Sequence, residues 1–204
     1  MDIFDLAKAR KMFGGEGGGV VSIIESTTPS KSLTLNDFVR VGALRFPNAE
    51  SIGDYAFQDC ASLTSIDLPA ATSIGNNAFY GCTALTSIDL PSAARVNDGA
   101  FSDCINLEKA DLHSATSIGN GAFRGCTNLQ AIILRTTETV CVIDPTAIAL
   151  DADENGNPTQ LANYYVPASM YEYYRAAYEP AFEEYGFAGY FDVVFHKIED
   201  LPEI

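Results

Sequence analysis

The chain has 204 residues, of which 47% are hydrophobic, and it carries a formal net charge of −15. At this length we expect one domain with a sizeable core, and no apolar run approaches the ~18 residues that span a bilayer. An acidic surface repels phosphate backbones and anionic headgroups, which argues against binding to nucleic acid or to a membrane surface.

Residues 1–19 are predicted to form a short amphipathic helix followed by a tether. Ile3, Phe4 and Leu6 supply apolar surface, and the glycine-rich residues 14–19 form a flexible link. No Lys-Ser or Lys-Thr follows these glycines, so the segment is not expected to cradle a phosphate. The segment also lacks the continuous apolar stretch of a secretory signal peptide.

The dominant feature of the chain is a period of 22 residues, which recurs from residue 57 to residue 134. Self-similarity of this length predicts a solenoid, in which each unit buries its apolar side against the next. We expect the solenoid to span residues 20–143, including a degenerate first repeat. The positions that stay identical are Phe57, Phe79, Phe101 and Phe123; Cys60, Cys82, Cys104 and Cys126; Leu63, Leu85, Leu107 and Leu129; and Leu68, Leu90, Leu112 and Leu134.

Each repeat divides into a strand and a turning segment. In residues 63–69 the apolar side chains alternate with Ser65 and Asp67, which predicts a strand with one face buried and one face outward. In residues 73–82 we expect Gly75 and Asn76 to turn the chain, because Gly, Asn and Asp tolerate positive φ.

The periodic pattern decays after Leu134. Val140 keeps the ladder position of Ile118, and the polar residues 151–158 are predicted to form a loop. We interpret residues 144–204 as a cap that covers the last open coil, which solenoids require.

This cap is predicted to contain a helix near residues 169–178. Ser169 and Glu172 fit a capping box at its start, and Pro180 is expected to break or kink it. A final strand is expected from Tyr190 to Phe195.

The repeating unit, L-x-x-I-x-L-P followed by SIG-x-x-AF-x-x-C, resembles the BspA-like leucine-rich repeat of bacterial surface proteins. The resemblance covers residues 35 to about 143. It implies an α/β solenoid, a right-handed leucine-rich-repeat superhelix with a parallel sheet on its concave face, irregular convex segments and an aromatic-rich helical C-terminal cap. It also implies a binding or adhesion role at the cell surface. Short versions with a glycine-rich tether look like prophage-encoded proteins, so a phage-associated or cytoplasmic location stays open.

The outward side chains of the predicted strands form two rows along the sheet. Three aspartates about one strand spacing apart repel one another, so we expect Arg45 and Lys109 to relieve the two ends. The alternatives are a solvated acidic face and a site for a basic partner or a cation. One row is Arg45, Asp67, Asp89, Asp111 and Ile133, and the other is Ser65, Ser87, Lys109 and Ala131.

The ladder cysteines and Cys141 are expected to be reduced core residues. Stacked coils could bring equivalent thiols close enough for a disulfide, but a spacing of 22 contains no Cys-x-x-Cys pair that would favour zinc. Asp151, Asp153 and Asn155 resemble the start of a calcium loop, yet Ala162 stands where such a loop needs a bidentate glutamate. No cofactor or metal is therefore expected.

The tyrosine-rich helix is compatible with cap packing and with an exposed interaction patch. His113 is expected to be exposed, and the spacing suggests no nucleophile–base pair. We therefore predict a non-enzymatic module that binds a protein or a glycan. The alternative is a structural or assembly component, docked through its N-terminal helix to a phage particle or an envelope.

Overall fold

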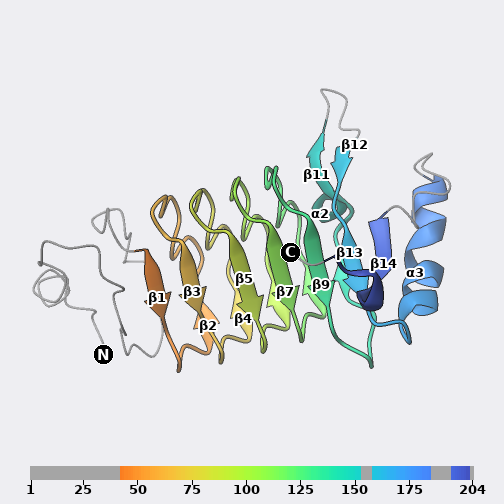
Figure 1. The fold of residues 1–204 in the computed structure, drawn as a ribbon, viewed down its shortest axis with the longest axis horizontal. Helices are drawn as coiled ribbons and strands as arrows, with labels where there is room; N and C mark the ends of the chain where they lie inside the picture. The colour runs from red at the N-terminus through yellow and green to blue at the C-terminus, as the bar shows by residue number, and fades with distance from the viewer. Residues whose placement is uncertain (1–41, 153–157, 185–193, 203–204) are drawn as a thin grey trace, which may run out of the picture.

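The structure of the protein is a computed structural model that describes residues 42–152, 158–184 and 194–202. The predicted N-terminal helix and tether, and the start of the degenerate first repeat, lie outside these ranges. The described residues form a solenoid of parallel strands with about five turns, closed at one end by a small cap (Figure 1).

One strand per coil builds the sheet that we call the front sheet. Partners lie in register and 22 residues apart along the repeats, as in the pairing of Ser87 with Lys109. Together with the cap strands that extend it, the front sheet consists of β1 (Ala43–Arg45), β3 (Ser65–Asp67), β5 (Ser87–Leu90), β7 (Lys109–Leu112), β9 (Ala131–Leu134), β13 (Tyr164–Val166) and β14 (Phe195–Lys197). Strand pairing joins β1 to β3 and, separately, joins β5, β7, β9, β13 and β14 in that order, while β3 and β5 lie side by side on consecutive coils (Figure 1).

A second parallel sheet, the back sheet, lies across the core from the front sheet. The resemblance implied an irregular segment in this half of the repeat; the structure places a two-residue strand at its start, and turns follow. Each coil contributes a strand of only two residues to this sheet. The Ile or Val of each strand is buried in the core, and the residue before it faces outward. The strands are β2 (Ser51–Ile52), β4 (Ser73–Ile74), β6 (Arg95–Val96), β8 (Ser117–Ile118) and β10 (Val142–Ile143).

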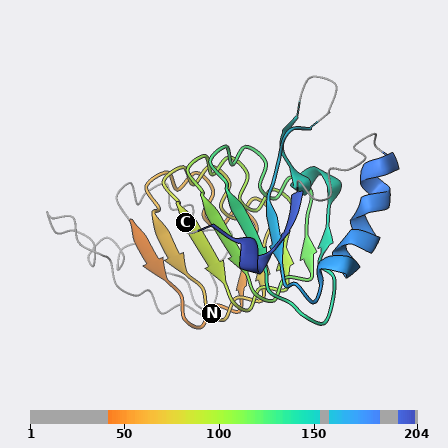
Figure 2. The same ribbon diagram turned by 45° about the vertical axis from the view of Figure 1, so that its right-hand side comes forward.

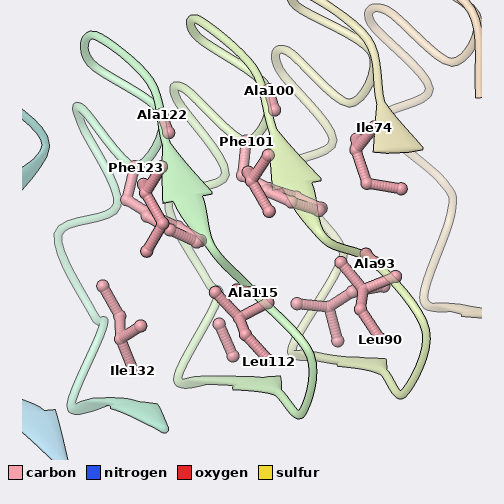
Figure 3. Close-up of a cluster of buried hydrophobic side chains, with 14 of the residues drawn as sticks. Ile74, Leu90, Ala93, Ala100, Phe101, Leu112, Ala115, Ala122, Phe123 and Ile132 are labelled. Atoms are coloured by element: carbon pink, nitrogen blue, oxygen red, sulfur yellow. The ribbon is translucent and has the colours of Figure 1, made fainter. Parts of the chain in front are cut away.

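The repeated apolar residues form rows through the interior, as predicted (Figure 3). The rings of Phe57, Phe79, Phe101 and Phe123 stack with centroids 5.1, 5.1 and 5.5 Å apart and nearly parallel planes. All four are buried. Stacked rings at this spacing add to the free energy gained by burying their area.

A third ladder of backbone hydrogen bonds joins the turns of consecutive coils, which connect the back sheet to the front sheet. The amide of Phe79 donates to Ala100 O, and that of Phe101 donates to Ala122 O, at 2.7 and 2.8 Å. Two residues per turn take positive φ, among them Asn77 and Gly81, so the residue types are those expected, but the positions are not the predicted Gly75 and Asn76. Gly75 serves differently, because a Cβ there would lie 2.6 Å from the backbone of Asp54.

The last coil is three residues longer than the others. Ile143, and not Val140 as predicted, pairs with Ile118, since the extra residues fall in the loop between β9 and β10. The short helix α2 (Pro145–Ile148) then replaces the usual turn, and Ala147 is buried like the equivalent Ala122. The solenoid thus continues beyond the point where the sequence pattern fades.

The cap begins with an antiparallel hairpin of β11 (Ala149–Ala152) and β12 (Pro158–Leu161), so strands flank the predicted loop. The helix α3 (Tyr171–Glu184) starts two residues after the proposed capping serine and continues through Pro180, which does not break it. The final strand is β14, which begins at Phe195, the last residue of the predicted strand, whereas residues 190–193 of that prediction lie outside the described ranges. The short 3-10 helix η2 (Ile198–Asp200) follows directly.

Tyrosine hydroxyls from α3 form hydrogen bonds with the backbone of β10 and of Cys141 just before it. This edge has no further coil to pair with. Tyr174 Oη accepts a hydrogen bond from the amide of Cys141 at 2.8 Å. Tyr178 Oη accepts from the amide of Ile143 and donates to Cys141 O, both at 2.7 Å. These two tyrosines therefore pack as part of the cap, whereas Tyr173 on the same helix is 64% exposed.

Candidate functional site

The outer face of the front sheet carries the residues that the sequence marked as candidate binding residues. The pairing register places Arg45 beside Asp67, Asp89 beside Asp111, and Asp111 beside Ile133, as predicted. Arg45 Nε lies 2.7 Å from Asp67 Oδ2, which confirms that arginine relieves this end of the row. Both side chains of this pair are more than half exposed.

Farther along the row, a network of four charged or titratable groups joins β5, β7 and the residues that follow β7 and β9. His113 Nε2 lies 3.1 Å from Asp89 Oδ1 and 3.4 Å from Asp111 Oδ1. Arg135 holds both oxygens of Asp111, with Nε 2.8 Å from Oδ1 and Nη2 2.6 Å from Oδ2. Hydrogen bonding to Asp111 raises the pKa of the Arg135 guanidinium.

This network corrects three expectations about the row and its neighbours. Asp111 does not face solvent like Asp89, since its side chain is 12% exposed and that of Asp89 is 70% exposed. The cation that pairs with Asp111 is Arg135 and not Lys109, because a residue just past the end of β9 reaches back over the neighbouring strand. His113, expected to be exposed, is half-buried between the two carboxylates.

The second outward row also lies in register. Ser87 pairs with Lys109, and Lys109 with Ala131. Ser65 and Ser87 are exposed, but Ala131 is buried. The polar outward positions therefore extend to β7, where Lys109 is half-buried and Asp111 is buried, and the chain itself covers the face beyond β7.

What covers it is the C-terminal segment, whose η2 lies in front of the sheet (Figure 2). Ala131, Ile133 and Tyr165 form a small apolar cluster on the outer face, against which Ile198 and Leu201 pack. We call these three residues the apolar patch. Sequence analysis found Ala131 and Ile133 as members of the rows, but it missed Tyr165 and the segment that covers them.

The ladder cysteines lie in the core and are free thiols. The Sγ atoms of Cys82, Cys104 and Cys126 donate to the carbonyls of Phe57, Phe79 and Phe101, at 3.1, 3.1 and 3.0 Å. Hydrogen bonding between neighbouring thiols, together with burial, raises the pKa values of Cys82 and Cys104.

Cys141, off the ladder, is buried as expected, and burial raises its thiol pKa to about 12. Thiols held in the protonated form are poor nucleophiles and poor metal ligands. Cys60 is the least buried of the five.

Among the described residues, no group of three or more His, Cys, Asp or Glu side chains could hold a metal ion. Residues 153–156 of the calcium-like loop lie outside the described ranges. Every helix that the structure describes is too short or too polar to serve as a membrane span.

Residues 50–148 match the BspA type leucine rich repeat region in six copies. No curated protein and no solved structure matches the chain. The family match coincides with the coils that carry the stacked phenylalanines and the exposed outer face.

Proposed function

Because residues 50–148 are a BspA-type leucine-rich repeat region, we propose that the protein is a non-enzymatic binding or adhesion module. It presents the outer face of the front sheet, from β1 to β7, to a protein or a glycan. Repeats of this family are generally protein-interaction or adhesion modules. In this protein, the outer face of the front sheet would be the surface that makes the interaction.

The observation that carries the proposal is the repetition of an exposed serine and an exposed aspartate on consecutive strands. Ser65 and Asp67 on β3 recur as Ser87 and Asp89 on β5, and all four are exposed. Because β3 and β5 occupy the same place in consecutive coils, these polar groups repeat side by side along the outer face (Figure 1). Such an array suits distributed polar contacts with an extended partner better than the enclosure of a small molecule.

The charges along the face favour a partner that brings cationic or hydroxyl groups. Asp67 already pairs with Arg45, and Asp111 with Arg135. Asp89 lies beside the imidazole of His113 and, by strand register, beside Asp111, and it is the most exposed acid of the row. A lysine side chain, or the hydroxyls of a sugar, could therefore hydrogen-bond to Asp89 with little rearrangement.

The test is a comparison of two double variants on a glycan array and on an array of basic and neutral peptides. Replacement of Asp67 and Asp89 by Asn keeps the shape of the face and removes two charges, so binding of any captured probe should fall at least about tenfold, roughly 1.4 kcal/mol. Replacement of the exposed Glu50 and Glu138 by Gln removes the same charge elsewhere and should leave binding unchanged. Equal affinities for the two variants would remove the front face from consideration.

A further inference from the structure

The outer face of the front sheet changes character between β7 and β9. From β3 to β7 its outward positions hold serine, aspartate and lysine, but on β9 and β13 they hold Ala131, Ile133 and Tyr165. Outward apolar residues on a single sheet face imply that something covers them. The apolar residues on β9 and β13 therefore form a patch that another part of the chain covers.

The cover is attached to this patch through two aliphatic side chains. Ile198 and Leu201 are half-buried against the patch, while Glu199 and Asp200 between them are exposed. None of the three residues of η2 is fully buried, and its N-terminal end has no side-chain cap. The backbone hydrogen bond of Leu201 to Ile198 O is internal to the segment and does not tie it to the sheet.

The attachment is weak compared with that of the neighbouring strands. The preceding strand β14 pairs with β13 through three residues in register, and Phe195 is fully buried. Two half-buried aliphatic side chains bury far less apolar area than the fully buried Phe195 and the paired strand β14. A contact of this size can open without unfolding the cap, because segments with few buried contacts open locally.

We propose that Ile198–Leu201 is a displaceable strap, and that the apolar patch beneath it is a second binding station of the front face. The station accepts a peptide with two aliphatic side chains three residues apart, which is the arrangement that the strap itself presents. Lys109, in register beside Ala131, supplies a cation at the rim for the acidic residues of such a peptide. This inference concerns the covered end of the face and does not depend on Asp67 or Asp89, so either proposal can fail alone.

A labelled synthetic peptide of residues 196–202 is the probe, with the full-length chain as the receptor. In the unmodified chain the strap competes for the patch, so the peptide should bind weakly. Replacement of both Ile198 and Leu201 by Ser frees the patch, and the apparent affinity measured by fluorescence anisotropy should rise on the order of tenfold. Replacement of the exposed Glu199 and Asp200 by Gln and Asn should leave the affinity within about twofold of the unmodified chain, because the two aliphatic contacts remain.

An additional Ile133→Ser change in the strap variant should abolish the gain, since Ile133 is the centre of the patch. No gain for the Ile198/Leu201 variant, with its circular dichroism spectrum unchanged, would overturn the proposal.

Hydrogen exchange on the unmodified chain tests the strap even if the variant folds poorly. The amides of residues 198–201 should exchange in a step that leaves β13 and β14 protected. If these residues exchange only together with β13 and β14, the segment is an integral part of the cap and the strap proposal is wrong.

Discussion

The middle coils and the C-terminal cap solve the same problem with different groups. In the middle coils, backbone amides of one coil donate hydrogen bonds to carbonyls of the next, as the amide of Phe101 donates to Ala122 O. At the last coil no such neighbour exists, and the hydroxyls of Tyr174 and Tyr178 take its place. Repetition supplies hydrogen-bond partners without special residues, whereas the end of the stack depends on two particular side chains.

This difference decides how each region responds to substitution. A residue in the middle coils packs against the equivalent residue on both sides, so its loss opens a cavity shared by three coils. A tyrosine of the cap contributes hydrogen bonds that no other described residue duplicates at the same atoms. We therefore expect packing losses in the middle coils and hydrogen-bond losses at the end.

The largest expected effect is that of Phe101→Ala. Phe101 is fully buried and stacks on Phe79 and Phe123, so the change should lower the free energy of unfolding by about 3–5 kcal/mol. Urea unfolding followed by circular dichroism measures the loss. The control Phe101→Leu keeps most of the volume and should cost about 1.5 kcal/mol or less. A loss below 1 kcal/mol for the alanine variant, about the cost of an ordinary substitution, would contradict continuous packing between coils.

Tyr174→Phe comes next and probes the cap. The phenylalanine keeps the ring but leaves the buried amide of Cys141 without an acceptor, which should cost about 1–3 kcal/mol. Tyr173→Phe on the exposed side of the same helix is the matched control and should be nearly silent. Urea unfolding of the two variants side by side gives the comparison, and equal stabilities would show that the hydroxyl of Tyr174 does not cap the edge.

Two arginine–aspartate pairs on the front sheet allow a smaller comparison. Arg135→Gln removes the bidentate partner of the nearly buried Asp111 and should cost about 1.5–3 kcal/mol. Arg45→Gln breaks an exposed pair and should cost about 0–1 kcal/mol. Thermal unfolding at moderate salt ranks the two variants, and the opposite order would mean that exposure does not set the value of these pairs.

Alkaline pH should loosen the cap before the coils. Burial raises the pKa of Tyr178 to about 12, above its ordinary value of 10.0. Because the folded pKa exceeds the unfolded one, this contribution to stability is complete below pH 10 and is lost as the pH rises from about 10 to about 12. Stability measured against pH should show this loss in the unmodified chain and a smaller loss in Tyr178→Phe. Identical profiles for the two proteins would exclude Tyr178 as the source.

The sequence predicted the coils well, because one repeat constrains all the others. Inward Phe79 and Leu90, outward Asp67, and the register of both outward rows follow from period and alternation alone. The back sheet was missed because its strands are two residues long and too short to show alternation. Val140 was placed wrongly because the last coil has three extra residues, and Ile143, which is also aliphatic, takes the position beside Ile118.

The cap and the charge network could not be read from the period. Arg135 pairs with Asp111 on the neighbouring coil. The spacing of the repeat does not indicate that Arg135, and not Lys109, would reach Asp111. The helix α3 passes through Pro180, whose missing amide leaves one intrahelical hydrogen bond unmade but does not end the helix. The covering of Ile133 by Ile198 depends on the parallel pairing of β14 with β13 after helix α3, which no local pattern in the sequence predicts.

The most direct test of the account is the exchange of the Cys141 and Ile143 amides with deuterium. If α3 completes the solenoid, these edge amides should be protected to nearly the same degree as the amide of Phe101 in the middle coils. Tyr174→Phe should then release Cys141 selectively. Rapid exchange of both edge amides in the unmodified chain would mean that the stack is open at this end.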